Sequence, residues 1–248
     1  MKSIAIRMAV ATALCAGSLG AVAATNWNLT NLPANNPLVS GWKASSGTSN
    51  NANTLNGLDI YQTTVGYWSG SGIGVGGESS SDGQHSLDNK AGFEVALLSF
   101  DQQVRLESVN ADWIQTDSDI FVMAFTGSDS LTAATSLDGG TFKNLTSRGW
   151  TLVGNYADIG MAPKDLGTTT GTFANTYSSF WLIGAGAYTS GTGVSLSGDY
   201  DYLKIASVGG TIKPSNGGGG SVPEPGSLAL AGLAFLGMVA MRARKQSV

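Results

Sequence analysis

Two carboxylates stand one residue apart in Asp117-Ser118-Asp119, directly before an apolar run. Ca²⁺ takes six to eight oxygen ligands, and closely spaced aspartates at the start of a strand can supply some of them together with backbone carbonyls. We therefore regard Asp117 and Asp119 as candidate Ca²⁺ ligands, and Asp199 and Asp201 as a second candidate pair. The alternative is a turn in which Asp and Ser side chains bond their own backbone. No other cofactor is expected.

Residues that could support hydrolysis are few. His85 is the only histidine, and its nearest carboxylates, Asp82 and Asp88, lie on the same polar stretch, without a G-x-S-x-G nucleophile motif. A formal G-x-G-x-x-G match at residues 72–77 is followed by serines rather than by a helical period, so a dinucleotide site is not expected.

Glycosidases need two carboxyl groups that face one sugar bond. Nothing in the sequence pairs the glutamates of the central region, and we therefore expect no enzymatic activity. A secreted glycan-active hydrolase is the enzymatic alternative. These glutamates are Glu78, Glu94 and Glu107.

Tryptophan side chains offer a different chemistry. Exposed indoles stack on sugar rings, whereas most tryptophans are expected in the core because they are large and apolar. A Ca²⁺-assisted carbohydrate-binding module or adhesin is thus an alternative function. The six tryptophans are Trp27, Trp42, Trp68, Trp113, Trp150 and Trp181.

The end of the chain has three parts in a fixed order. Residues 214–221 contain four consecutive glycines and predict a flexible linker. A Pro-Glu-Pro motif follows, then the 16 apolar or small residues 226–241, which as a helix would measure about 24 Å and could enter a membrane. A basic cluster ends the segment and would stay on the cytoplasmic side. The motif is Pro223, Glu224 and Pro225, and the basic residues are Arg242, Arg244 and Lys245.

Residues 222–248 resemble the PEP-CTERM sorting signal of Gram-negative bacteria, in which these three parts are read by exosortase, an integral-membrane processing enzyme. The resemblance implies transient insertion into the inner membrane, removal of the tail, and a mature product at the cell surface or in the extracellular matrix. A plain C-terminal membrane anchor is the alternative.

The central region is also similar to a group of exosortase-dependent surface proteins. The similarity runs from Trp68 to Val208 and implies surface residence, but no established activity. Residues 25–66 match nothing that we can place. The segments that carry the similarity are 68–75, 87–89, 98–101, 104–106, 113–120, 149–156 and 181–185.

Residues 1–24 read as a signal peptide for signal peptidase. Lys2 and Arg7 precede an apolar run, and small residues around Ala23 form a cleavage site. Cys15, the only cysteine, would leave with this peptide, so the mature protein would contain no disulfide.

Composition excludes several classes of protein. Charged residues make up 12% of the chain, against a typical ~25%, and 35 of 248 residues are glycine. Residues 25–225 hold 8 Lys or Arg against 17 Asp or Glu. Nucleic acid is therefore not an expected partner, because phosphate contacts need clustered basic side chains.

Short apolar or alternating runs separated by Gly-containing turns predict strands, and no 12-residue window has an amphipathic helical period. We expect an all-β domain over residues 25–213, a single antiparallel β-sandwich of jelly-roll-like form. Its expected function is that of a non-enzymatic exported protein associated with exopolysaccharide in a biofilm. The predicted strand runs are 93–100, 104–107, 120–125, 150–153, 180–183 and 200–208.

Overall fold

The computed structural model describes residues 24–31, 36–44, 59–76, 85–90, 92–127, 133–188 and 200–214. The chain divides into two compact units, Met1–Lys213 and Pro214–Val248, and the fold belongs to the first. The predicted signal peptide, the Gly-rich linker and the C-terminal sorting segment lie outside the described residues, apart from Ala24 and Pro214. Within the described ranges, no helix has both the length and the apolar character needed to cross a membrane.

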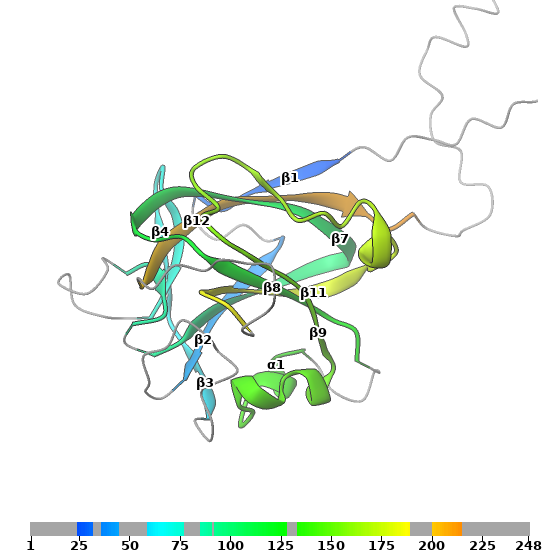
Figure 1. Cartoon of the computed structure of the whole chain (residues 1–248), viewed down its shortest axis with the longest axis horizontal. Helices are drawn as coiled ribbons and strands as arrows, with labels where there is room; N and C mark the ends of the chain where they lie inside the picture. Colours follow the sequence, from blue (N-terminus) through cyan, green and yellow to red (C-terminus); the bar gives the residue numbers. More distant parts are fainter. Residues whose placement is uncertain are drawn as a thin grey trace, which may run out of the picture. The chain divides into compact units, whose positions relative to one another are not determined.

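Twelve strands form one open antiparallel sheet, with the main order β4-β5-β12-β7-β11-β8-β9 (Figure 1). The predicted antiparallel β structure is confirmed in its coarser form: the described part of the domain is mostly β, with one short α-helix and three 3₁₀ turns beside the sheet. Two separate stacked sheets were expected, whereas the hydrogen-bonded ladders join all twelve strands into a single sheet. The strands are β1 (Thr25–Asn28), β2 (Leu38–Ala44), β3 (Ile60–Thr63), β4 (Val65–Trp68), β5 (Gly72–Val75), β6 (Leu87–Asp88), β7 (Glu94–Thr116), β8 (Ile120–Phe125), β9 (Trp150–Tyr156), β10 (Lys164–Asp165), β11 (Ser178–Ala185) and β12 (Asp201–Ile212).

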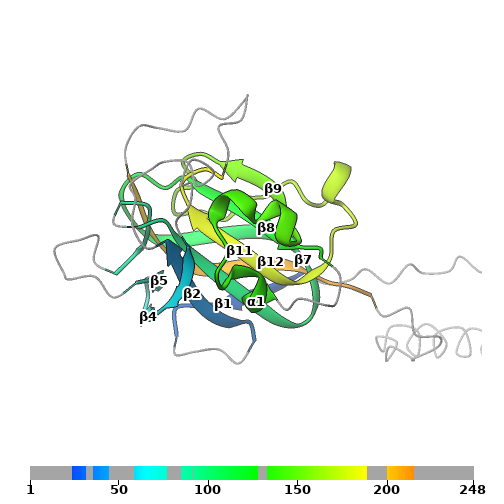
Figure 2. The same ribbon diagram turned by 90° about the horizontal axis from the view of Figure 1, so that it is seen from below.

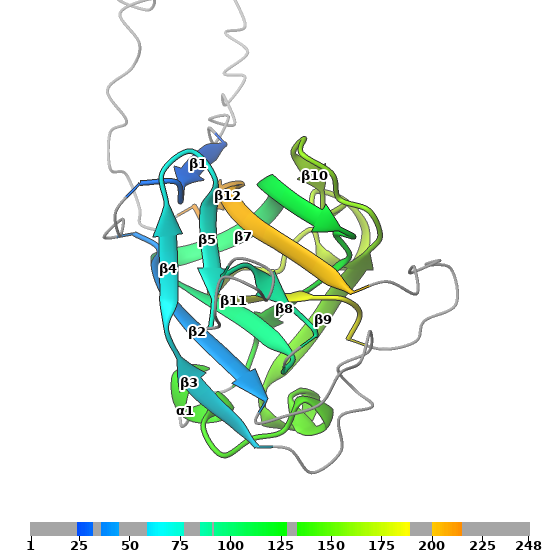
Figure 3. The ribbon, with the colours of Figure 1, turned by 90° about the vertical axis from the view of Figure 1, so that its left-hand side faces the viewer.

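Strand β7 holds the sheet together because it is 23 residues long and changes partners along its length. Its first part pairs with β2 on one side and β11 on the other, and its second part pairs with β12 from Val104 to Thr116. Figure 3 shows β12 beside β7, next to the β4–β5 hairpin. Two of the predicted strand runs, 93–100 and 104–107, are therefore parts of one strand.

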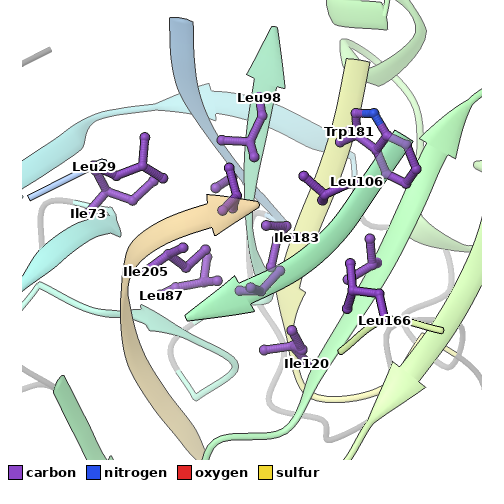
Figure 4. Packing of buried hydrophobic residues seen from close by; sticks show 14 of the residues in the cluster. Leu29, Ile73, Leu87, Leu98, Leu106, Ile120, Leu166, Trp181, Ile183 and Ile205 are labelled. Atoms are coloured by element: carbon purple, nitrogen blue, oxygen red, sulfur yellow. The ribbon is translucent and has the colours of Figure 1, made fainter. Parts of the chain in front are cut away.

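The larger hydrophobic cluster collects side chains from both halves of the sheet. Leu203 and Ile205 on β12 share it with Ile120 on β8 and with Trp181 and Ile183 on β11. In Figure 4 the side chains of Ile205, Ile183 and Ile120 lie around a common centre. Because successive side chains on a strand point to opposite faces, every second side chain of these strands can pack in this cluster. The cluster therefore joins the two halves of the sheet through buried apolar contacts.

The opposite side chains of β8 and β11 form a second cluster. Phe121 and Met123 on β8 and Leu182 on β11 pack with Leu137 and Phe142, which come from a short helical segment after β8. Figure 2 shows helix α1 over β8 and β11. Strand β8 is thus buried on both faces, as its unbroken apolar run predicts. The helical elements are α1 (Ala133–Leu137) and three 3₁₀ turns, Phe142–Asn144, Thr146–Arg148 and Gly171–Phe173.

Candidate functional site

Three aspartates from distant parts of the sequence meet at one end of the β7–β12 ladder. Strand β7 ends at Thr116, and β12 begins at Asp201, which is paired with Thr116 in the antiparallel register. Because antiparallel strands bring the end of one beside the start of the other, Asp117 and Asp119 arrive next to Asp201. One oxygen from each of the three carboxylates lies within 4.8 Å of the others. We call these three residues the aspartate cluster.

The cluster is buried and held by backbone hydrogen bonds. The exposed fractions of Asp117, Asp119 and Asp201 are 5%, 2% and 1%. Oδ1 of Asp201 accepts the N–H of Asp119 at 2.6 Å, and Oδ1 of Asp119 accepts the N–H of Asp158 at 2.8 Å. Asn89 binds Asp201 twice, donating from Nδ2 to Oδ2 at 2.6 Å and accepting the backbone N–H at 3.0 Å. These bonds fix the orientation of the carboxylates without supplying a compensating positive charge.

Burial dominates the electrostatics of the cluster. The pKa of Asp201 is raised from 3.8 to about 8, with burial as the largest cause. The negative charges of Asp119 and Asp117 also raise this pKa, whereas the hydrogen bonds from Asp119 and Asn89 lower it. A carboxyl group of this kind either keeps its proton near neutral pH or ionises when a cation is present.

The donor set matches the preference of a hard cation. Oxygens that each lie 2.3–2.6 Å from one Ca²⁺ are at most about 5 Å apart, which agrees with the 4.8 Å limit of the cluster. Three carboxylates provide part of the six to eight ligands, and each oxygen that accepts one hydrogen bond keeps a second lone pair. The cluster can thus hold a divalent cation if carbonyl or water oxygens complete the shell.

The sequence analysis did not place Asp201 or Asn89 beside Asp117 and Asp119. Asp201 was expected to form a separate pair with Asp199, a residue that lies outside the described residues. Asn89 was not considered, although it is fully buried and bridges to β12. Only the pairing of β7 with β12 joins these positions, and one sequence carries no direct signal for that register.

Among the described residues, the structure does not bring together the side chains that a hydrolase triad or a glycosidase carboxylate pair would need. His85 stacks on Trp68. Glu94 accepts the N–H of Asp88 and lies 3.6 Å from Lys43, whereas Glu107 binds Arg105. Both glutamates lie on β7, thirteen residues apart, which corresponds to roughly 40 Å of extended chain. That is much farther than the 5–9 Å that separates two glycosidase carboxyl groups.

The glycine-rich stretch and most tryptophans serve the fold. Residues 72–75 of the G-x-G-x-x-G match form strand β5, which pairs with β4 and β12. Four tryptophans are buried in the core, as predicted, while Trp68 and Trp113 are half-buried. The four core tryptophans are Trp27, Trp42, Trp150 and Trp181.

Both ends of the sheet-forming chain lie at the same end of β12. Thr25, the first residue of β1, pairs with Gly210, and β12 ends two residues later at Ile212. The aspartate cluster lies at the start of the same strand, roughly 40 Å away along a 12-residue strand. The chain therefore enters the sheet at Thr25 and leaves it at Ile212 far from the candidate cation site.

Comparison with known proteins gives one match. Residues 221–245 match the PEP-CTERM protein-sorting motif. No curated protein and no solved structure matches the chain. The motif covers the predicted Pro223, Glu224 and Pro225 and extends to Lys245, and it confirms the predicted resemblance. It implies an exported protein associated with the cell envelope and processed by exosortase. The chain is thus an exosortase-sorted protein that carries a PEP-CTERM signal at its C-terminus.

Proposed function

We propose that this protein is a non-enzymatic component of the cell surface or extracellular matrix that associates with exopolysaccharide after exosortase has processed its tail. The PEP-CTERM motif at residues 221–245 is the observation that carries the proposal. The all-β domain and the acidic balance of residues 25–225 are consistent with an exported, soluble domain that avoids nucleic acid and anionic lipid.

The sorting step is tested by replacing Pro223, Glu224 and Pro225 with alanine. Proline disfavours regular helix, and the matched motif contains two prolines. If exosortase reads this motif, the variant is expected to accumulate as an unprocessed precursor in the membrane fraction. Pro214→Ala, which lies outside the matched residues, is the control and should be processed normally. Normal processing of the triple variant would contradict the assignment.

The polysaccharide association needs a separate experiment. In the producing bacterium, the processed protein is expected to cosediment with its own exopolysaccharide and to appear in the medium when polysaccharide synthesis is blocked. Unchanged surface retention in the absence of polysaccharide would contradict the association, while leaving exosortase sorting intact.

A Ca²⁺-assisted carbohydrate-binding module or adhesin is the second candidate function. The convergence of Asp201 with Asp117 and Asp119 favours it, because three neighbouring buried carboxylates repel one another and a bound cation would offset that repulsion. In this function, Ca²⁺ would fix the turn between β7 and β8 against the start of β12. Polysaccharide binding would then be lost in chelator and restored by Ca²⁺.

A further inference from the structure

Lys204 lies between two tryptophan rings. Its Nζ is 3.8 Å from the ring centroid of Trp113 and 5.0 Å from that of Trp68. The Trp68 ring also stacks on the imidazole of His85, with centroids 5.6 Å apart and planes inclined by 13°. These four side chains come from β4, β7, β12 and the residue that precedes β6 by two positions. We call them the indole–lysine row.

Strand register places the row on the face opposite to the larger hydrophobic cluster. Lys204 is paired with Trp113 across the β12–β7 ladder, and its neighbour Leu203 points into the core. On β4, Trp68 follows Tyr67, which packs against that same core. Since successive side chains on a strand point to opposite faces, Trp68, Lys204 and Trp113 share the outer face of the sheet.

Lys204 is a largely buried residue, and its ammonium group has no anionic partner in the part of the chain that the structure describes. The residue is 3% exposed, and burial lowers its pKa. Among the residues that the structure describes, no carboxylate forms an ion pair with its Nζ and no acceptor forms a hydrogen bond with it. The indole faces attract the positive charge, but an ammonium has three N–H donors that seek oxygen acceptors. The two tryptophans beside it are partly exposed.

We propose that the indole–lysine row binds an acidic sugar, a hexuronate unit of a polysaccharide, with the carboxylate on Lys204 and a C–H face of the sugar on Trp68 or Trp113. This inference deepens the polysaccharide association proposed above and rests on it. A carboxylate supplies the charge-assisted hydrogen bond that the ammonium lacks. The C–H bonds of the sugar match the negative face of an indole ring.

The acidic net charge of the domain implies that binding of an acidic polymer would depend mainly on one lysine, Lys204. Residues 25–225 hold more than twice as many acidic as basic residues, so an acidic polymer would be repelled by most of the domain. Binding would then depend on the local cation at Lys204 rather than on a general basic surface. Removal of an exposed lysine elsewhere should therefore have little effect.

The test uses the full chain, purified in a mild detergent, and titrated calorimetrically with polygalacturonate and with carboxyl-reduced polygalacturonate. The unmodified protein is expected to bind the acidic polymer at least about ten times more tightly than the reduced one. Lys204→Met should lose a factor on the order of ten to a hundred, the usual effect of a charged hydrogen bond. Lys204→Arg should retain most of the affinity, and the exposed Lys143→Met serves as the charge-matched control.

Equal affinity of Lys204→Met and the unmodified protein would overturn the inference, and so would equal binding of the acidic and reduced polymers. The polymer comparison needs no variant, so it decides the question even if Lys204→Met does not fold. Binding of the producer's own exopolysaccharide without binding of polygalacturonate would overturn the hexuronate site alone. Binding of neither polymer would overturn the polysaccharide association together with the site.

Discussion

The backbone N–H of Asp119 donates a 2.6 Å hydrogen bond to Oδ1 of Asp201, a residue 82 positions later in the chain. This bond joins the turn between β7 and β8 to the first residue of β12. It also brings a third carboxylate into a place where two are already buried. The stability of this end of the sheet therefore depends on the ionisation state of Asp201.

The free energy of unfolding is expected to fall as pH rises from about 4 to about 8 in the presence of chelator. The pKa of Asp201 is raised from 3.8 to about 8 in the folded protein, so over this range the native state binds more protons than the unfolded state. Each pH unit then costs up to about 1.4 kcal/mol from this group, and its contribution becomes constant above the folded pKa. Urea denaturation followed by tryptophan fluorescence measures the slope.

Asp117→Asn provides the matched test of that slope. The variant removes one of the negative charges that raise the pKa of Asp201, and its amide oxygen can still accept the N–H of Ser118. We expect a shallower slope and a more stable protein at pH 8. Asp138→Asn, at an exposed position outside the cluster, should behave like the unmodified protein. A slope that Asp117→Asn leaves unchanged would place the pH dependence elsewhere.

Calcium is expected to raise the thermal midpoint, and by more at pH 9 than at pH 6. Ca²⁺ binds ionised carboxylates, and the ionised fraction of Asp201 grows through its pKa near 8. A free Ca²⁺ concentration one hundred times the dissociation constant would stabilise the fold by about 2.7 kcal/mol. Differential scanning calorimetry in Ca²⁺ and in chelator measures the effect. Asp119→Asn should abolish it, and identical midpoints in both buffers at pH 9 would exclude a cation at this cluster.

The sequence predicted the elements better than their pairing. Apolar runs located β8, β9, β11 and β12 to within a few residues because a strand buried in the sheet needs apolar side chains at most positions. The runs at 93–100 and 104–107 are separated by Asp101, Gln102 and Gln103, which are exposed, and this polar break concealed the continuity of β7. Where a long strand exchanges one set of partner strands for another, a short polar stretch gives the same sequence pattern as a turn.

The candidate site was only half predictable for the same reason. Asp117 and Asp119 were identified because they are neighbours in the sequence. Asp201 joins them through an antiparallel register that depends on the whole β7–β12 ladder, including its three irregularities. Lys204 carried no signal either, since a lone lysine in an alternating strand predicts a solvent-facing charge rather than a cation between two indoles.

Gly184→Ala is expected to destabilise the fold by about 1–3 kcal/mol through overpacking. Gly184 on β11 is paired with both Phe121 and Val95, and a Cβ at this position would overlap the Phe121 ring and lie 2.8 Å from Cγ1 of Val95. The second hydrophobic cluster would have to shift to admit it.

Gly209→Ala is the control for that substitution. Its Cβ would meet the hydroxyl of Ser108 at 2.5 Å, and a rotation of that short side chain can relieve the contact. Chemical denaturation of the two variants should therefore give a clearly larger loss for Gly184→Ala. Equal losses would show that the Phe121 ring adapts as easily as a serine hydroxyl.

Gly66→Ala should displace the Trp68 ring and expose it to solvent. The indole of Trp68 folds back over Gly66 of its own strand, and a Cβ there would overlap the ring. The ring would then lose its stacking on His85 and its contact with Lys204, and the pKa of Lys204 should change because its surroundings open to water. Acrylamide quenching of tryptophan fluorescence should increase in Gly66→Ala and stay unchanged in Gly209→Ala. Unchanged quenching in both variants would show that the Trp68 ring keeps its position even with a side chain at residue 66.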